Sequence, residues 1–517
     1  MPWQISGLSL FMSFFSAGTF VVWGAIAYQY GWVAVTIQWM MGLGGLVIGY
    51  FIAPAWRKTR ALTAAEFIRE RLDIRVQRLY TYIFLLLSFF YTGAFLYPVA
   101  KLVNVSTGFP IEWSILLLGI TIMIYTAVGG LWAVVVTDVL QFVILTAAVL
   151  IVVPLALDRV AGVSGFIEQA PADFLQLING EYTLGFLIAF AFYNTCFIGG
   201  NWAYVQRYTS VKDAPSARKV GYLFAGLYLI SPVLWMLPPM IYRLLEPGLS
   251  GLANEGAYLL MCQEVLPAGM LGLMLGGMIF ATASSVNTTL NLSAAVFTND
   301  IFKQLRPQAT EQHLMRIARL STVAFGVVTV GVAMLVPLAG GIVEVVLTIG
   351  ALTGVPLYGP PIWALFSRRQ TGTSVLTVTL VSLAINAFFK FISPGLLSIS
   401  LDRAEEMVLG VTSPLVLLAS YELWAFFRHR VSARYQYYAQ QQTTRTAEAA
   451  DASASLQNRY ALKVMALSLL GVGFLVVVLG IREETGQLIT LVVGMSIWAV
   501  AGLLWHTKRK MTISKAS

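Results

Sequence analysis

A cluster of hydroxyl and amide side chains in the middle of this sequence is its best candidate for binding chemistry. One face of a helix would carry, at a spacing of three or four residues, Ala281, Ser284, Ser285, Thr288 and Asn291. Two interpretations are open. The hydroxyls can bond to carbonyls of their own helix or across a packing seam, at under about 1 kcal/mol each. Alternatively, they can form a cradle of neutral oxygens for a hard monovalent cation.

A single carboxylate, Asp138, is the second candidate. It lies in the run Val-Val-Thr-Asp-Val-Leu-Gln, near the start of an apolar stretch and among few other charges. A carboxylate inside a membrane is costly, so it must face a cavity, an ion or a cationic partner. An ion site and a structural salt bridge to a basic inner loop are both compatible with this position.

The elements that must position these side chains are membrane helices. The chain of 517 residues is 58% hydrophobic and 11% charged, with a mean hydropathy of +0.77, which excludes an ordinary water-soluble enzyme. Apolar runs long enough to cross a bilayer predict fourteen spans, near 6–28, 32–55, 79–103, 112–130, 133–156, 183–205, 219–243, 266–302, 317–338, 341–366, 373–394, 405–427, 461–481 and 486–506.

The net charge of +9 orients the protein and does not indicate a nucleic-acid partner. Most Lys and Arg residues lie in predicted inner loops, which is the positive-inside pattern. We therefore expect a multi-pass protein of the inner (plasma) membrane with both termini in the cytoplasm. The first apolar run lacks a basic flank and an A-x-A site, so we expect no cleaved signal peptide. The predicted outer side holds only Lys101, Arg159, Arg243, Lys390, Arg403 and Arg482.

Two predicted spans are interrupted by small or polar residues, at 16–19 in the first and at 197–201 in the sixth. Broken helices five spans apart are typical of an inverted five-plus-five repeat. The polar segment 428–460 predicts a flexible cytoplasmic linker. Beyond it, 461–517 predicts an accessory helix pair followed by a basic cytoplasmic tail.

Four stretches together resemble the sodium/solute symporter family, which includes sodium/glucose, sodium/proline and sodium/sialate transporters. ATASSVNTTLNLSAAVFTNDIF at 281–302 resembles the eighth core helix, and PWQISGLSLFMSFFSAGTF at 2–20 resembles the first. The runs 124–145 and 201–219 resemble the helix 4–5 junction and the exit of helix 6. The resemblance covers the chain to about residue 370 and implies an all-α polytopic membrane protein with a LeuT-like inverted 5+5 repeat. Most members begin with an additional helix, which this sequence does not show.

The resemblance also implies ion sites made of neutral oxygens. The shared sodium site would use the carbonyls of Met12, Phe15 and Ala281 and the hydroxyls of Ser284 and Ser285. In members with a second sodium, Asp138 would act with Asn287 and Thr288, where Asn287 departs from the usual hydroxyl. Na⁺ is thus the expected coupling ion.

The substrate pocket matches the family less well. Asn194 falls where the sugar-transporting branch of the family has a polar contact with the sugar. Three of the five polar contacts of that branch are lost in this sequence. Tyr228, for example, stands where a Lys is expected. The expected lining is aromatic and uncharged: Thr19, Phe20, Asn194, Phe197 and Tyr228. For each aromatic residue, simple packing is the alternative. A neutral solute is preferred, with a polyhydroxylated, sugar-like one slightly favoured.

The predicted organisation is therefore a transport core at 1–370, with repeats at about 1–156 and 183–366, followed by two more membrane helices at 371–427. We expect a symporter that binds a small-molecule solute and lies in the lipid bilayer, with no enzymatic activity. A proton-coupled transporter and a transporter-like membrane sensor are the alternatives. The solute, the Na⁺ stoichiometry and the oligomeric state do not follow from the sequence.

Overall fold

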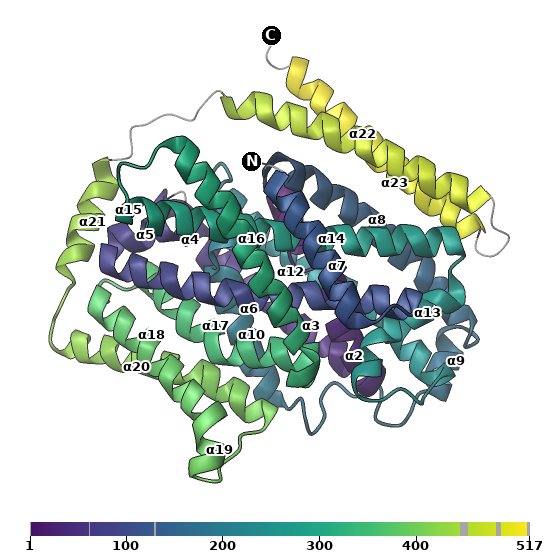
Figure 1. Cartoon of the computed structure of the whole chain (residues 1–517), viewed down its shortest axis with the longest axis horizontal. Helices are drawn as coiled ribbons and strands as arrows, with labels where there is room; N and C mark the ends of the chain where they lie inside the picture. The colour runs from purple at the N-terminus through teal and green to yellow at the C-terminus, as the bar shows by residue number, and fades with distance from the viewer. Residues whose placement is uncertain (1, 62, 129–130, 445–452, 482–486, 514–517) are drawn as a thin grey trace.

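The protein is built from membrane-length helices (Figure 1). The computed structural model describes residues 2–61, 63–128, 131–444, 453–481 and 487–513, and in these ranges it contains helices and no strands. Seven described helices are long and apolar enough to cross a membrane, and two bent pairs bring the number to nine. Shorter apolar helices cover several other predicted spans. The all-α polytopic fold is confirmed, while the count of fourteen spans stays a prediction.

The first predicted repeat corresponds to a series of helices beginning with a broken one. Its elements are α1 (Trp3–Met12), η1 (Thr19–Trp23), α2 (Gly24–Tyr30), α3 (Val33–Val47), η2 (Ile48–Ile52), α4 (Ala53–Thr59), α6 (Ile74–Thr107), α7 (Ile111–Val128) and α8 (Leu131–Asp158). Two short helices accompany them, α5 (Ala64–Arg71) and α9 (Gly162–Gln169).

The second predicted repeat also begins with a broken helix. Its elements are α10 (Leu184–Gly200), α11 (Trp202–Thr209), α12 (Ala214–Leu245), α14 (Ala268–Val296), η4 (Phe297–Phe302), α16 (Glu311–Leu335) and α17 (Ile342–Phe366). Between α12 and α14 lie η3 (Gly251–Gly256) and α13 (Ala257–Val265). Two short elements, α15 (Lys303–Leu305) and η5 (Pro337–Ala339), flank α16.

Corresponding helices of the two repeats pack together. In one group, α3 packs against α10 and α12, and α1 runs along α12; in the other, α6, α7, α14 and α16 contact one another. Small residues allow the close approach of α12, since a Cβ at Gly45 would lie 2.8 Å from the Phe224 ring. The symmetry of these contacts is that expected of an inverted repeat.

Both helix breaks have a local cause. After Met12, the backbone leaves the α-helix through single turns that include a bond from the Phe15 amide to the Met12 carbonyl (3.2 Å). Between α10 and α11, Asn201 adopts an extended conformation and its side chain accepts the Ala203 amide at 3.0 Å, so it caps α11. The two helices meet at 65°.

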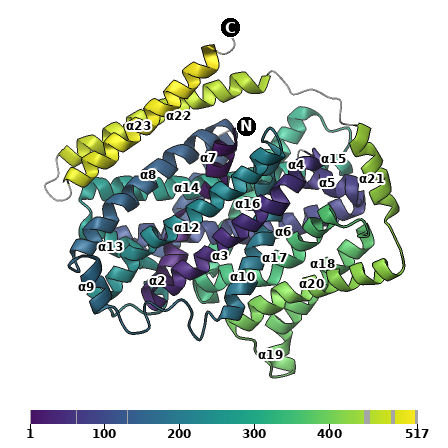
Figure 2. The ribbon, with the colours of Figure 1, turned by 180° about the vertical axis from the view of Figure 1, so that it is seen from behind.

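Additional helices surround this core (Figures 1 and 2). The elements α18 (Gly372–Ala387), η6 (Phe388–Ile392), α19 (Ser393–Leu396) and α20 (Arg403–Phe427) lie together at one edge. The hairpin of α22 (Ser453–Ile481) and α23 (Gln487–Ile513) lies along the opposite side and contacts α8. Large apolar side chains such as Ile124 and Ile230 are exposed on the surface, as a lipid-facing protein requires.

The segment predicted as a flexible linker, 428–460, differs from expectation on both sides of residues 445–452, because 453–460 belong to α22 and its first part is helical as well. Residues 433–444 form α21 (Ala433–Thr444), which packs on α5. The ring of Tyr438 lies 5.9 Å from that of Phe67, and Arg434 donates to the Glu70 carbonyl at 3.0 Å. These contacts dock a polar helix that has little apolar periodicity of its own. Residues 445–452 lie outside the described structure.

Candidate functional site

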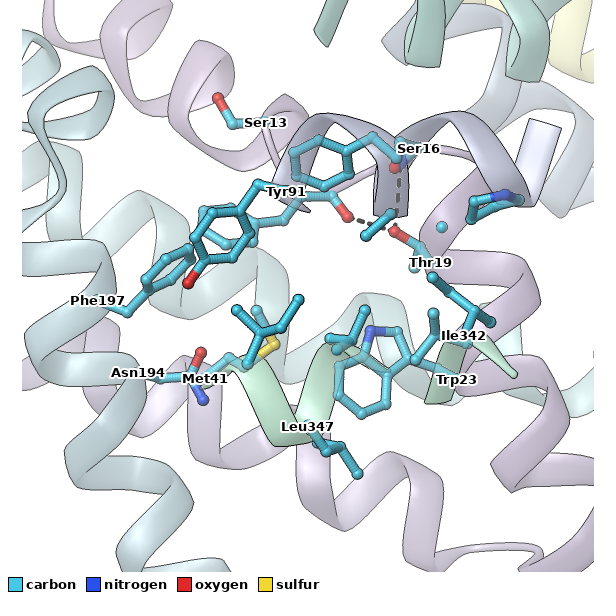
Figure 3. A pocket seen from close by; sticks show the side chains of 18 of the residues that line it. Ser13, Ser16, Thr19, Trp23, Met41, Tyr91, Asn194, Phe197, Ile342 and Leu347 are labelled. Atoms are coloured by element: carbon cyan, nitrogen blue, oxygen red, sulfur yellow. Dashed lines mark hydrogen bonds between the residues drawn. The ribbon is translucent and has the colours of Figure 1, made fainter. Parts of the chain in front are cut away.

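A cavity of about 130 Å³ lies where the break in the first helix faces α10, α12 and α17. Four of the five predicted substrate residues line it, namely Thr19, Asn194, Phe197 and Tyr228. Figure 3 shows Asn194 and Phe197 across the cavity from Trp23 and Ile342. The breaks therefore create a central space bounded by both repeats.

Several polar groups of this cavity are already bonded to the protein. The Thr19 hydroxyl accepts the Ser16 amide at 3.2 Å and donates to the Phe14 carbonyl (Figure 3). Asn194 donates from its amide nitrogen to the Phe190 carbonyl at 2.9 Å. The Tyr228 hydroxyl, in contrast, is buried and has no hydrogen-bond partner among the described residues. Tyr228 thus lines the cavity and carries a hydroxyl that no described residue bonds.

Phe20 does not line this cavity. It is fully buried, and its ring lies 4.4 Å from that of Tyr258 and 5.4 Å from that of Phe15. It neighbours Thr19 in sequence but projects into the packing between η1 and α13. The packing alternative therefore describes Phe20, and we do not keep it among the proposed substrate contacts.

The cavity also has walls that the sequence did not reveal. Trp23, Tyr91 and Tyr193 contribute rings, and the first turns of α17 contribute Ile342 and Leu347. Only one pattern in the sequence could have pointed to any of them. Glycines at 350 and 354 leave room on α17 for the Tyr193 ring, since a Cβ at either position would meet it.

A second cavity, of about 120 Å³, is lined by three of the five residues predicted to bind sodium. Met12 at the end of α1 and Ala281 and Ser285 on α14 line the same space. The Ser285 hydroxyl donates to the Ala281 carbonyl at 3.3 Å, and Thr289, one turn further along, lines the cavity too. Residues 269 positions apart thus line one space, which Arg207 of α11 lines as well.

The other predicted ion ligands are placed less directly. Phe15 is not among the residues lining this cavity, and its ring packs 4.5 Å from that of Trp235. The Ser284 side chain lies outside the described residues, as do those of Asp138, Asn287 and Thr288. The helices that carry Asp138 and Asn287, α8 and α14, pack against each other.

The two cavities share a wall, and Ser13 stands at both. An aromatic group formed by Tyr91, Phe95, Phe197 and Tyr204 lines each of them. Phe197 lies 6.0 Å from Tyr91 and 5.7 Å from Tyr204 between ring centroids. These residues come from α6, α10 and α11, so these three helices form the shared wall.

A multi-pass helical core with two broken helices around a central cavity is the architecture of secondary transporters. The family model of the sodium:solute symporters matches residues 1–381, and the chain belongs to that family. The resemblance found in the sequence is thereby confirmed. The family is one of transporters.

Individual relatives support the same assignment. The chain is 26% identical over 456 residues to a sodium/glucose cotransporter of Vibrio parahaemolyticus, covering 81% of this chain and 82% of the relative. It is 27% identical over 420 residues to sodium/glucose cotransporter 2 of Rattus norvegicus, covering 71% of this chain but only 62% of the relative. A solved Na⁺-coupled sialic acid symporter matches the fold with a TM-score of 0.65 and 22% identity, covering 82% of this chain and 90% of that one.

Proposed function

We propose that this protein imports a small uncharged organic solute together with Na⁺ by alternating access. The observation that carries the proposal is the juxtaposition of Met12 with Ala281 and Ser285 around one cavity that shares a wall with the central one. Ion and solute spaces that share a wall allow occupation of one to alter the other. None of the described residues lining the central cavity is charged, which favours a neutral solute.

The proposed sodium ligands are the carbonyls of Met12, Phe15 and Ala281 with the hydroxyls of Ser284 and Ser285. Oxygen ligands suit a hard cation. Because these ligands are neutral, they hold a monovalent ion weakly enough for it to leave on the inner side. An ion between α1 and α14 favours the arrangement in which the two helices lie together, and this couples ion binding to the position of the broken first helix.

We place the protein in the inner (plasma) membrane with both termini in the cytoplasm, as the charge distribution predicts. In that orientation the membrane potential drives Na⁺ inward. One ion provides about 2.3 kcal/mol per 100 mV and about 1.4 kcal/mol per tenfold gradient. Together these sustain roughly 500-fold accumulation of a neutral solute, so a single Na⁺ suffices for concentrative uptake.

The test is a solute screen followed by uptake into proteoliposomes. Purified protein is first screened for thermal stabilisation by solutes in NaCl and in KCl. Uptake of each stabilising solute is then measured under an inward Na⁺ gradient, and separately under an inward proton gradient without Na⁺. We expect accumulation only with Na⁺. Accumulation that ignores Na⁺ and follows the proton gradient would establish the proton-coupled alternative.

We further propose that Asp138, with Asn287 and Thr288, contributes to a second ion site. Asp138→Asn should weaken Na⁺ activation or lower the number of Na⁺ ions per solute while the protein still inserts and folds. A variant that aggregates when the wild type does not would favour the structural salt bridge.

A further inference from the structure

The central cavity is lined almost entirely by apolar and aromatic side chains. Fourteen of its twenty-two lining residues are apolar or glycine, four are tyrosines, and the other four are Ser13, Ser16, Thr19 and Asn194. An ionised solute would lose its hydration here with no opposite charge among these residues to replace it. The cavity therefore selects against charged solutes.

The same lining offers few hydrogen bonds to a solute with many hydroxyls. The hydroxyl of Ser13 donates to the Ser9 carbonyl at 3.0 Å, and that of Tyr91 lies 3.2 Å from the Thr353 hydroxyl. Thr19 and the amide nitrogen of Asn194 are also bonded to the protein. A hexose brings several hydroxyls, and each one buried without a partner loses its hydrogen bonds to water without replacement. Such a solute is a poor match for this space.

The size of the cavity and the shape of its walls point to a single ring. An apolar cavity of about 150 Å³ accommodates benzene, and this one measures about 130 Å³. Along α10, the rings of Phe190, Tyr193 and Phe197 follow one another with centroids 5.5 Å apart. Aromatic faces of this kind attract flat rings by stacking or edge contact.

From these observations we propose that the solute is an uncharged, single-ring compound with a flat, largely apolar body and one or two polar groups, one of which bonds to the Tyr228 hydroxyl. That hydroxyl is buried and has no partner among the described residues, and Tyr228 is one of the residues that line the cavity. This inference rests on the proposed symport function and narrows it. It departs from the slight preference for a sugar-like solute.

The test compares four chemical classes on the purified full-length protein. Binding is measured as thermal stabilisation at millimolar concentration, in NaCl and in KCl, with uracil, nicotinamide and benzamide as ring solutes. Glucose and galactose represent hexoses, proline represents zwitterions, and pyruvate represents anions. We expect at least one ring solute to stabilise the protein in NaCl and the other classes to have no effect. Stabilisation by a hexose, proline or pyruvate, or by no ring solute, overturns the proposal.

The cations separate this inference from the proposed function. A ring solute that binds equally in NaCl and KCl would support the solute class and contradict Na⁺ coupling. A hexose that binds only with Na⁺ would support Na⁺ coupling and contradict the proposed solute class.

A pair of variants tests the hydroxyl contact. Tyr228→Phe should weaken binding of the ring solute by about 5- to 150-fold, as expected for the loss of one buried hydrogen bond. Tyr258→Phe is the matched control, because Tyr258 is equally buried and does not line the cavity. Equal affinity in both variants would overturn the assignment of Tyr228 to the solute.

Discussion

The main-chain amide of Ala17, in the break of the first helix, donates a hydrogen bond of 3.2 Å to the hydroxyl of Thr282 on α14. The two residues lie 265 positions apart, and both are buried. The Thr282 hydroxyl itself donates to the Met278 carbonyl at 3.1 Å. One side chain thus fixes the broken helix of the first repeat against the helix that carries the proposed sodium ligands.

This bond predicts an effect of Thr282→Val, which keeps the side-chain shape and removes the hydroxyl. The Ala17 amide would lose its partner, at a cost of about 1–3 kcal/mol. We expect a lower thermal unfolding midpoint and weaker Na⁺ activation of transport, since the break would be less well positioned. Thr322→Val serves as the control, because Thr322 is buried on α16 and bonds to the Ala318 carbonyl of its own helix. Equal effects of the two variants would contradict the prediction.

A charged network at the predicted outer side connects four segments of the chain. Arg403 at the start of α20 pairs with Glu181, which precedes α10, and with Glu344 on α17 at 3.0 Å. Lys390 in η6 pairs with Glu344 at 3.2 Å and with Glu406 at 2.8 Å. These side chains are only partly exposed, so the network is better shielded than an isolated surface pair.

We therefore expect Arg403→Met to destabilise the protein by more than about 1 kcal/mol, which is the most that an exposed pair typically contributes. Two carboxylates would lose their common partner. The loss should shrink in high salt, which screens the repulsion between them. Thermal unfolding at low and high NaCl measures this, with Arg159→Met as the control, because the exposed Arg159 bonds to the Glu264 carbonyl. A salt-independent loss would show that packing of the Arg403 side chain matters and its charge does not.

Glu255 in η3 is a buried carboxylate that caps α17 from another segment. Its oxygens accept the Ile342 amide at 2.9 Å and the Tyr97 hydroxyl at 2.8 Å, and it is 4% exposed. Burial raises the pKa of Glu255 above its ordinary value of 4.5, although both hydrogen bonds and Lys101 oppose the shift. The folded protein therefore binds this proton more tightly than the unfolded chain does.

The sign of this shift fixes the pH dependence. The stabilisation from the protonated carboxyl is fully present below pH 4.5 and is lost as the pH rises through the raised pKa of the folded state. Glu255→Gln should remove this dependence. The thermal midpoint of the variant should therefore rise relative to that of the wild type as the pH increases. Glu246→Gln, at an exposed carboxylate near the end of α12, is the control. A constant difference between wild type and Glu255→Gln across this range would contradict the prediction.

Sequence patterns predict neighbours along one helix better than they predict walls built from several helices. The run from Ala281 to Ser285 lies on a regular helix, so its spacing predicted which oxygens share a face. The walls contributed by Trp23 and Tyr193 depend on how distant helices pack, and no periodicity records that. The helix α21 was missed because its docking depends on single aromatic contacts such as Tyr438 on Phe67.

The two interpretations of the polar face of α14 differ in the quantity that a mutation changes. If Ser285 is a sodium ligand, Ser285→Ala removes a coordinating dipole from a buried ion, at about 1–3 kcal/mol. The Na⁺ concentration for half-maximal uptake should then rise about 5- to 150-fold. If Ser285 only bonds to the Ala281 carbonyl, stability should fall by about 0.6 kcal/mol and Na⁺ activation should not change.

We expect the first outcome for Ser285→Ala and for Ser284→Ala, with a larger shift in the double variant and normal expression of all three. Solute affinity should fall only when Na⁺ is below saturation, because the hydroxyls act on the ion and do not contact the solute. Ser293→Ala is the matched control, since Ser293 is buried on the same helix and does not itself line the second cavity, although its hydroxyl donates at 2.8 Å to that of Ser88, which does. It should lower stability slightly and leave Na⁺ activation as in the wild type. If both Ser284→Ala and Ser285→Ala behave like Ser293→Ala, the sodium site does not lie on α14, and the coupling proposed between α1 and α14 is wrong.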